Sequence, residues 1–207
     1  MKKKTVVAFD FDGTITMKDT LFLFIMFSRG KGRLLLGILL FLPLIAAMKL
    51  KIYTNEKVKE RLFSYFFKGV SIEKFDDWCR KFSLIIDGIL RQKTIEKMHF
   101  HKNHGDEILI ISASVENWIK PWADKVGVDV VLATKIETDC NGLLTGKFLT
   151  KNCTGEEKVN RLTAAFPCRS NYRLVAYGDS RGDKQLIEFA DMGYLWQGDS
   201  YPRILRK

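Results

Sequence analysis

A run of apolar residues near the amino end of the chain stops at two aspartates. Val6–Phe9 leads directly to Asp10, and Asp12 and Gly13 follow. A short, uninterrupted apolar run predicts a buried strand, and open α/β sheets place their functional groups at the carboxyl ends of such strands. Because side chains alternate along a strand, the two carboxylates can face one ligand only if the chain leaves strand geometry here, which Gly13 allows. The alternative is an acidic turn without chemistry, and the rest of the chain argues against it.

Further apolar runs predict the remainder of a parallel sheet. The expected strands are residues 5–10, 107–112, 129–133, 173–178 and 192–196, and the expected helices between them are 89–103, 115–126, 155–166 and 182–190. Strands that alternate with helices are typical of a parallel sheet covered on both faces. The sequence therefore predicts an α/β fold.

Residues 17–88 interrupt this alternation. They contain long apolar and amphipathic helical patterns and no convincing strand, so we predict an all-helical domain inserted after the first strand. Residues 1–16 and 89–207 would together form the α/β core domain. Within that core, residues 134–150 alternate in polarity around Asn141-Gly142, which predicts a β-hairpin.

Charge and cysteine usage limit the partners and the compartment. The 34 Lys and Arg residues against 24 Asp and Glu residues give a net charge of +10, which favours phosphorylated metabolites, nucleic acid or anionic lipid. Basic residues are not clustered with exposed aromatic residues in a recognisable module, so we expect no nucleic-acid partner. The four cysteines have no regular spacing, and the basic start leads into a strand, so we predict a reducing, cytoplasmic location without a secretory signal.

Polar groups also stand where other predicted strands end or helices begin. Ser112 ends one apolar run, Lys158 lies early in a predicted helix, and Asp179 and Asp183 follow the run that ends at Gly178. Phosphoryl transfer needs a nucleophile, a cation to offset phosphate charge, hydrogen-bond donors and a proton donor for the leaving group. A carboxylate can be the nucleophile, and Mg²⁺ binds carboxylate oxygens. Each group alone is a weak signal, but their order and placement together predict a phosphoryl-transfer site.

These motifs resemble those of the haloacid dehalogenase superfamily of phosphohydrolases. The matching segments are Asp-Phe-Asp-Gly-Thr at 10–14, the strand that ends at Ser112, Gly155-Glu-Glu-Lys158, and Gly178-Asp-Ser-Arg-Gly-Asp183. The resemblance extends over residues 5–183 and implies a Rossmann-like core with an inserted helical cap. It also implies a Mg²⁺-dependent phosphomonoester hydrolase that forms an aspartyl-phosphate.

The resemblance assigns an expected role to each acidic residue. Asp10 would be the nucleophile and a Mg²⁺ ligand. Asp12 would be the general acid and base, and would bind Mg²⁺ through its backbone carbonyl. Asp179 would be a metal ligand, and Thr14 and Asp183 would support the site.

The same resemblance implies which residues hold the phosphoryl group. Ser112, Ala113 and Lys158 are expected to bind it. The second acidic residue, Asp12, separates phosphatases from dehalogenases, because a phosphatase needs a proton donor for the leaving alcohol and the dehalogenase branch lacks this residue. We therefore expect a phosphatase.

The insertion directly after the first motif resembles the helical cap of the phosphoserine phosphatase-like branch, subfamily IB. Caps close over the site, so substrate choice would depend on residues 17–88. Asp19 stands nine positions after Asp10, at the spacing of the acidic residue that meets the substrate ammonium in phosphoserine phosphatases. Two departures weaken an assignment to phosphoserine, namely Gly13 in place of serine and Ser112-Ala-Ser114 in place of Ser-Gly-Gly.

The cap contains an uncharged run, Leu34–Met48, with lysine and arginine on both sides within residues 31–51. As a helix this run would span roughly 22 Å at ~1.5 Å per residue. That is shorter than the ~30 Å hydrocarbon core of a bilayer, and Pro43 would kink the helix, so both features disfavour a transmembrane span. Two other interpretations stay open: a buried cap helix, or a helix that dips into an anionic membrane surface with its basic ends at the headgroups.

The cap also resembles that of lipid phosphatases of the phosphatidylglycerophosphatase C type, in its Leu-rich run with a central proline followed by lysine. We therefore expect the substrate to be a lipid-linked or amphiphilic phosphate, with residues 31–51 in peripheral contact with the anionic inner face of the membrane. The alternatives are a phosphatase for phosphoserine or another small metabolite, and a non-catalytic membrane-surface adaptor on the same fold.

Two other patterns are expected to be structural. His99, His101 and His104 could suggest a transition-metal site, but no cysteine or carboxylate with suitable spacing follows, so we predict surface histidines. The aromatic stripe within Phe63–Phe67 has helical spacing and predicts packing inside the cap.

Overall fold

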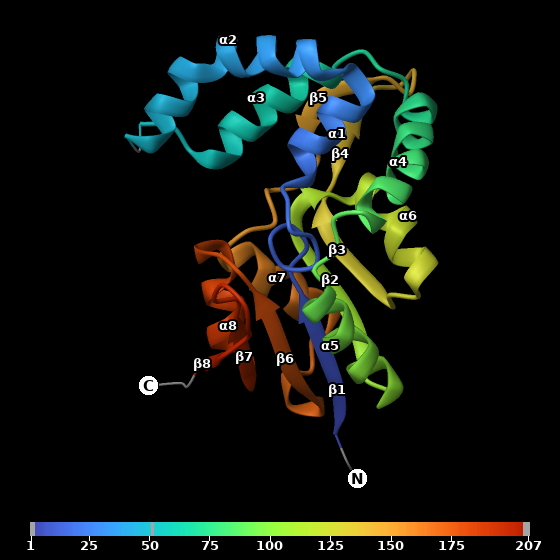
Figure 1. Cartoon of the computed structure of the whole chain (residues 1–207), viewed down its shortest axis with the longest axis vertical. Helices are drawn as coiled ribbons and strands as arrows, with labels where there is room; N and C mark the ends of the chain where they lie inside the picture. The colour runs from blue at the N-terminus through green and yellow to red at the C-terminus, as the bar shows by residue number, and fades with distance from the viewer. Residues whose placement is uncertain (1–2, 51, 205–207) are drawn as a thin grey trace.

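A six-stranded sheet forms the centre of the computed structural model, which describes residues 3–50 and 52–204 (Figure 1). The strand order is β3 (Val130–Thr134), β2 (Glu107–Val115), β1 (Lys4–Phe9), β6 (Tyr172–Gly178), β7 (Met192–Leu195) and β8 (Arg203–Ile204). All neighbouring strands are parallel except β8, which pairs antiparallel to β7. The predicted α/β fold with a parallel sheet is confirmed.

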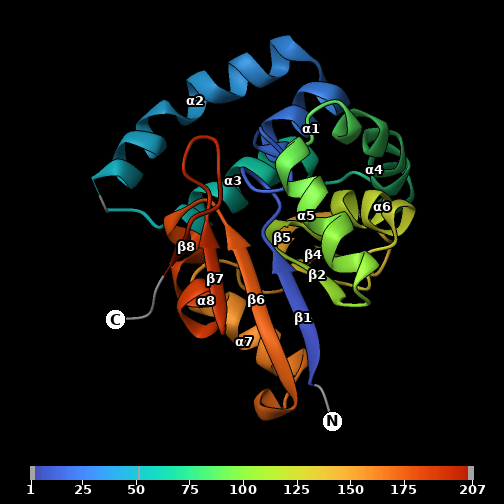
Figure 2. The same cartoon turned by 60° about the horizontal axis from the view of Figure 1, so that its bottom comes forward.

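Helices cover both faces of this sheet, as Figure 2 shows. The helices are α5 (Gln92–Asn103) and α6 (Glu116–Val126) on one face, and α7 (Glu156–Ala165) and α8 (Lys184–Phe189) on the other. Side chains of β1 alternate between the two layers, so that Val7 and Phe9 pack with α5 and α6 while Val6 and Ala8 pack with α7 and α8. Burial on both faces explains why this strand is apolar without interruption.

Four helices lie beyond the carboxyl ends of β1 and β2 (Figure 1). They are α1 (Thr20–Arg29), α2 (Lys31–Lys49), α3 (Asn55–Phe67) and α4 (Ile72–Asp87). Their core is aromatic: the Phe24 ring lies 5.2 Å from Phe75 and from Phe82, and 4.9 Å from Trp118 of α6. The stripe that includes Phe63 and Phe67 is buried in the same cluster, as the helical spacing predicted.

The predicted hairpin is present and packs against α3 of these four helices, which are together called the cap below. Strands β4 (Ile136–Thr138) and β5 (Leu144–Phe148) are antiparallel on either side of the Asn141-Gly142 turn. Leu144 exchanges two backbone hydrogen bonds of 2.8 Å with the segment just after α3, accepting from Gly69 and donating to Val70. The division into a core (1–16 and 89–207) and a cap (17–88) stays a prediction.

Two local features differ from the sequence-based expectations. The predicted strand 107–112 continues to Val115, and the pairing of β2 with β3 shifts register after Ser112. The prediction of three surface histidines is wrong for His101, whose ring is buried. Its Nδ1 lies 2.7 Å from Asp106 Oδ2 and its Nε2 lies 3.1 Å from the Tyr177 hydroxyl, so both ring nitrogens have partners away from water.

Helix α2 is unusual among the described helices. It is 19 residues long, and its length and apolar composition would suffice to cross a membrane. Gly37 is its only fully buried residue. Of the two interpretations left open by the sequence, the buried cap helix is therefore wrong for the fold as it stands, because most of α2 faces outward.

Candidate active site

The chain turns sharply where β1 ends. The Asp10 amide donates to the Tyr177 carbonyl at 2.9 Å, as a last sheet bond. The chain then leaves the strand, and Gly13 has φ of 81°, in the left-handed region that favours glycine. A Cβ at Gly13 would collide with the carboxylate of Asp179, so the turn also needs a residue without a side chain for packing. This turn is the departure from strand geometry that two converging carboxylates require.

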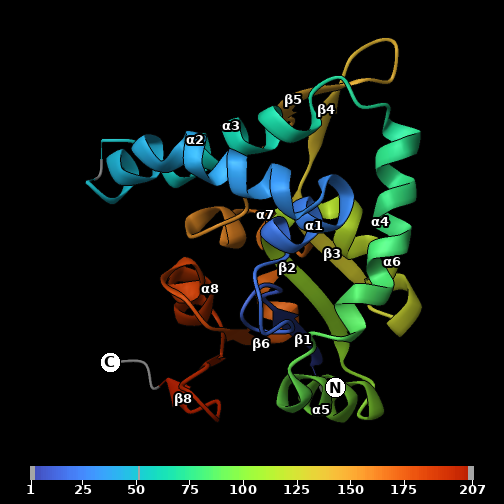
Figure 3. The ribbon, with the colours of Figure 1, turned by 45° about the horizontal axis from the view of Figure 1, so that its top comes forward.

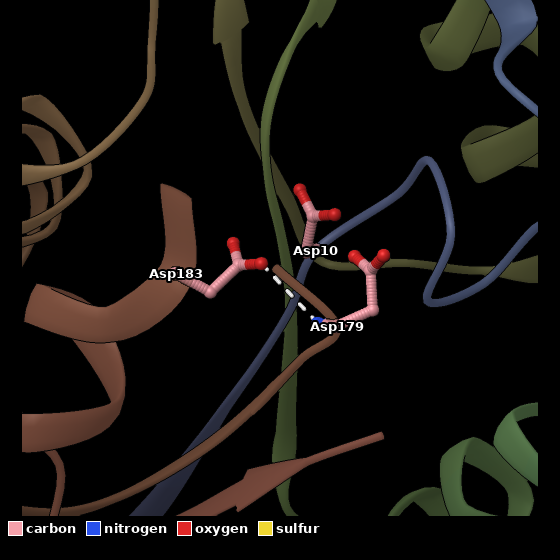
Figure 4. Close-up of side chains that lie close together, drawn as sticks. All are labelled: Asp10, Asp179 and Asp183. Atoms are coloured by element: carbon pink, nitrogen blue, oxygen red, sulfur yellow. Dashed lines mark hydrogen bonds between the residues drawn. The ribbon is translucent and has the colours of Figure 1, made fainter. Parts of the chain in front are cut away.

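Three aspartates meet at this edge of the sheet. Asp10 follows β1, while Asp179 and Asp183 follow β6, and carboxylate oxygens of all three lie within 4.8 Å of one another (Figure 4). Asp10 and Asp183 are buried and Asp179 is half-buried. Segments more than 160 residues apart in the chain are thus brought to one point by the parallel pairing of β1 with β6.

Lys158 supplies the positive charge of the cluster. This residue lies in the first turn of α7, and its side chain is buried. Its Nζ is 2.5 Å from Asp10 Oδ1 and 2.5 Å from Asp183 Oδ1. Burial alone would lower the pKa of Lys158, but the two carboxylates raise it well above its usual range, so the ammonium stays charged.

The three carboxylates differ in how readily they ionise. Burial raises the pKa of Asp10 well above its usual value, although the Lys158 ammonium opposes the shift. Burial, and then the charge of Asp183, raise the pKa of Asp179. Burial acts the same way on Asp183, but Lys158 and the donors of Ser180 outweigh it and lower that pKa. One lysine therefore does not offset the charge on the Asp10 and Asp179 side of the cluster.

The donor set fits a hard divalent cation. Both oxygens of Asp183 are engaged, Oδ1 by Lys158 and Oδ2 by the amide and hydroxyl of Ser180 at 3.0 and 2.9 Å. Asp10 and Asp179 are less engaged, since Asp10 binds Lys158 through one oxygen and Asp179 accepts from the Thr14 hydroxyl at 3.2 Å. Carboxylate oxygens that lack a compensating cation suit Mg²⁺, which takes one or two carboxylates and completes its shell with water and phosphate.

Asp12 lies on the cap side of this cluster. Its Oδ1 accepts from the Thr20 amide at 2.9 Å and from the Thr20 hydroxyl at 2.7 Å, at the start of α1. Its Oδ2 accepts from the Ser114 hydroxyl, at the end of β2. The carboxylate is therefore fixed between the first cap helix and the sheet edge.

Two of the three residues expected to hold phosphate, Ser112 and Ala113, lie at the end of β2, and the third, Lys158, lies in α7. Pairing of Phe9 with Ile110 places Ser112 at the same sheet edge as Asp10. Ser112 is buried, and its Oγ accepts from the Ser114 amide at 3.1 Å. The Ala113 carbonyl accepts a 2.9 Å hydrogen bond from the Thr134 hydroxyl.

Asp19, the expected substrate contact, begins helix α1. Its side chain caps that helix and accepts from the Leu21 amide at 2.9 Å. The residue is exposed and directly precedes Thr20, the buried hydrogen-bonding partner of Asp12. Asp19 is thus at the cap side of the site rather than in the acidic cluster.

Lys59 is a site residue that the sequence reasoning missed. It extends from α3 toward the sheet edge, where its Nζ donates to the Ala113 carbonyl at 2.8 Å. Burial lowers the pKa of Lys59, while the nearby carboxylates of Asp12, Asp19 and Asp10 oppose that shift. Only the packing of α3 distinguishes Lys59 from Lys57, the other lysine of this helix, because both lie in the same polar, amphipathic sequence pattern.

Comparison with known proteins gives three results. The family model of haloacid dehalogenase-like hydrolases matches residues 7–188. Protein CicA of Caulobacter vibrioides is 30% identical over 188 residues, which are 90% of this chain and 83% of CicA. Two solved structures share the fold, each at 20% identity and over 94% of this chain. A protein of unknown function from Bordetella pertussis Tohama I has a TM-score of 0.80, and the match covers 89% of that protein's chain. A phospho-aspartyl intermediate analogue of phosphoserine phosphatase has a TM-score of 0.61 and is covered over 86%.

Proposed function

The chain belongs to the haloacid dehalogenase-like hydrolases, and we propose that it is a Mg²⁺-dependent phosphatase that works through an aspartyl-phosphate on Asp10. One observation carries this proposal: the buried Asp10 carboxylate binds Lys158 through one oxygen and lies beside Asp179 in a single acidic cluster. A nucleophile, a cation and a metal ligand are thus within reach of one phosphoryl group.

The proposed reaction has two displacement steps. In the first, a carboxylate oxygen of Asp10 bonds to phosphorus as the bond from phosphorus to the ester oxygen breaks, and the leaving oxygen takes a proton from Asp12. In the second, Asp12 takes a proton from water, and the water oxygen bonds to phosphorus as the acyl-phosphate bond breaks. Phosphate leaves and the Asp10 carboxylate is restored.

Each nearby group supports a part of this reaction. Lys158 keeps Asp10 oriented and offsets charge as phosphate enters. The hydrogen bonds from Thr20 and Ser114 hold Asp12 at the cap side, where a leaving alcohol would be found. When bound, Mg²⁺ would be held by Asp10 and Asp179 and would offset the charge of the phosphoryl oxygens. Ser112 would donate its hydroxyl to one of those oxygens.

The test is hydrolysis of p-nitrophenyl phosphate by the purified chain, with Mg²⁺ and then with excess EDTA. We expect turnover that EDTA abolishes and Mg²⁺ restores, together with an acid-stable, hydroxylamine-sensitive phosphoprotein in quenched samples. Turnover that persists in EDTA would contradict the metal assignment. Turnover without any phosphoprotein in rapid-quench samples would contradict the aspartyl-phosphate.

We also propose that the substrate is a lipid-linked or amphiphilic phosphate, because of the outer face of helix α2. Figures 1 and 3 show α2 beside α3, on the side that faces away from the sheet. Its outward side chains are at least half exposed, and they are Leu35, Leu36, Leu39, Leu40 and Leu42. Soluble proteins rarely expose a large contiguous apolar patch, and a helix that is apolar all round is ordinarily buried.

The ends of α2 favour an anionic membrane surface as the partner of this face. Lys31 and Arg33 open the helix and Lys49 closes it, and the nearest acidic residue after it is Glu56. Juxtaposed apolar and basic groups suit the headgroup region of an anionic bilayer. The peripheral, inner-leaflet location that the sequence suggested is therefore part of the proposal.

Packing argues that α2 lies on the membrane rather than across it. Gly37 is pressed against the ring of Phe66, and the Phe41 ring lies 5.7 Å from that of Tyr65, so α3 holds one side of α2 near its middle. A helix of 19 residues is about 28 Å long at 1.5 Å per residue, but a span would have to break these contacts with α3. A helix held flat can bury its outer leucines in the headgroup and upper acyl region.

A phosphatase for phosphoserine or another small metabolite is the second candidate. The structural likeness to a phosphoserine phosphatase favours it. So do the two charged side chains on the cap side of the site, Lys59 and Asp19, which could meet the carboxylate and the ammonium of a zwitterion. A screen of phosphoserine against lysophosphatidic acid and phosphatidylglycerol phosphate separates the two. We expect the larger kcat/KM with a lipid phosphate, and a clear preference for phosphoserine would overturn this choice. A chain that binds vesicles without any turnover would be an adaptor.

A further inference from the structure

The turn that follows Asp10 is held in place by residues 91–94, the segment that follows the cap. Three successive carbonyls of the turn are involved, those of Gly13, Thr14 and Ile15. The Arg91 guanidinium donates from Nη2 to the first at 2.8 Å, and the Arg91 amide donates to the third at 2.8 Å. The middle one accepts from the Thr94 hydroxyl at 2.7 Å. Residues 91–94, where the chain re-enters the core, therefore clasp the turn that follows Asp10.

The same guanidinium is also linked, through Trp196, to the turn that carries Asp179. Arg91 Cζ lies 4.0 Å from the centre of the Trp196 ring, which is the distance of a close cation–π contact. The Trp196 amide donates to the Gly178 carbonyl at 2.8 Å, directly before Asp179. Arg91 thus joins the turn after β1 to the turn after β6.

These contacts of Arg91 set the spacing between the carboxylates of Asp10 and Asp179. The turn at Gly13 lies against the side chain of Asp179, with no room for a Cβ, and the Thr14 hydroxyl donates to Asp179 Oδ1 at 3.2 Å. A shift of the Gly13 turn would therefore move Asp179 relative to Asp10. Groups that orient metal ligands from outside the ligand set commonly change metal affinity by 10–100-fold when they are removed.

We propose that Arg91, with Trp196 as its platform, is a positioning residue that fixes the Asp10 turn against Asp179 for Mg²⁺ binding. The inference rests on the proposed Mg²⁺ site and goes beyond it, because it gives residues 91–94, where the chain re-enters the core, a part in metal binding. Lysine cannot replace Arg91 here, since it lacks both the planar face for Trp196 and the forked donors.

If Arg91 acted only through its charge, its removal would change Mg²⁺ affinity in the opposite direction. A cation near Asp179 repels Mg²⁺, so removal of its charge alone would tighten Mg²⁺ binding. Positioning predicts weaker binding whether the charge is removed, as in Arg91→Met, or kept, as in Arg91→Lys. The two variants together therefore separate geometry from charge.

The experiment is titration calorimetry of the full chain with Mg²⁺ alone, in the absence of substrate. We expect Arg91→Lys, Arg91→Met and Trp196→Leu to weaken Mg²⁺ binding by about tenfold or more. Trp196→Phe keeps an aromatic platform and should bind Mg²⁺ as the wild type does. Arg80→Lys on the exposed side of α4 is the matched control and should be unchanged.

Two results would overturn the inference: an Arg91→Lys variant that binds Mg²⁺ as tightly as the wild type, or an Arg91→Met variant that binds it more tightly. If the Arg91 variants do not fold, the contrast between Trp196→Leu and Trp196→Phe decides, and equal Mg²⁺ affinities for these two would overturn it. A wild-type chain that binds no Mg²⁺ would instead overturn the proposed metal site, so the two failures are distinguishable.

Discussion

The acidic cluster at the sheet edge and the outer face of α2 meet water in opposite ways. The first buries charged groups: Asp10, Asp183 and Lys158 are almost completely removed from solvent. The second exposes apolar groups: Leu35 and Leu39 are 61% and 54% exposed. Each arrangement is unfavourable for the folded chain by itself, since buried charge needs a counter-charge and exposed apolar surface orders water.

The difference teaches that the two regions need different partners. A divalent cation offsets the cost in the acidic cluster, and it would not help α2. An apolar phase offsets the cost at α2, and it would not help the cluster. Chemistry and location should therefore be separable by mutation, each change leaving the other property intact.

Asp10→Asn should have the largest effect. The amide has nearly the same shape but cannot form the acyl-phosphate, so we expect kcat for p-nitrophenyl phosphate to fall by at least about 10⁴-fold. Vesicle binding should not change. Asp77→Asn, on the exposed surface of α4, is the control and should keep full turnover. Comparable turnover in both variants would remove Asp10 from the mechanism.

Lys158→Met should damage both chemistry and stability. Its removal leaves Asp10 and Asp183 buried without their counter-charge, and breaking a buried ion pair in this way costs roughly 3–5 kcal/mol. We expect that loss in the free energy of unfolding, measured with urea in EDTA, with turnover too low to detect. The same substitution at the exposed Lys184 should change neither. A stable Lys158→Met protein would mean that the two aspartates are protonated in the fold.

The third prediction concerns pH and Mg²⁺. Burial raises the folded-state pKa of Asp10 and Asp179, so above the ordinary Asp value of about 4 the folded chain holds protons that the unfolded chain has lost. Their contribution to stability therefore falls as pH rises from the ordinary Asp pKa toward the raised pKa of each group. The contribution of Asp183 rises with pH instead, because the pKa of Asp183 is lowered.

Bound Mg²⁺ should reverse the loss, since it favours the ionised carboxylates. The stabilisation by Mg²⁺ should reach about 2.7 kcal/mol at a hundred times its Kd near pH 8 and be much smaller at pH 5. Thermal unfolding with and without Mg²⁺ at the two pH values measures this difference. Equal stabilisation at both would contradict the placement of Mg²⁺ at Asp10 and Asp179, and Asp179→Asn should flatten the dependence.

The sequence predicted the acidic cluster better than it predicted the cap. Asp10 and Asp179 could be placed together because each directly follows an apolar strand, and parallel strands bring their carboxyl ends to one edge. Their neighbourhood is therefore fixed by local patterns and one topological rule. Lys158 followed from the same order of motifs, although its contact with Asp183 as well as with Asp10 needed the structure.

Lys59, Arg91 and His101 could not be found in this way. Each owes its place to the packing of one helix or connection against a distant segment: α3 over β2, the returning cap segment behind Gly13, and α5 under Tyr177. Such contacts leave no period or spacing in the sequence. The orientation of α2 was equally hidden, because an apolar run has the same pattern whether it is buried or exposed.

The role of the outer face of α2, the second region of the comparison, can be tested by substitutions in that helix. Replacing Leu35, Leu39 and Leu42 by serine removes apolar surface from the outer face, and we expect binding to anionic vesicles to fall at least about tenfold. Turnover of p-nitrophenyl phosphate should stay the same, because these side chains do not contact the acidic cluster. Flotation measures the first and a colorimetric assay the second. Leu84→Ser with Leu149→Ser, exposed leucines elsewhere, should leave both unchanged.

The smallest expected effect comes from the basic ends of the same helix. Lys31→Gln, Arg33→Gln and Lys49→Gln should each weaken binding to anionic vesicles by about 1 kcal/mol, or roughly fivefold, at low salt. Raising the salt to about 1 M shortens the Debye length to ~3 Å, so the difference from the wild type should disappear there while the leucine effect persists. Three exposed lysines elsewhere serve as the charge-matched control: Lys97, Lys147 and Lys184. If their triple glutamine variant lost as much binding, net charge rather than α2 would hold the chain at the surface.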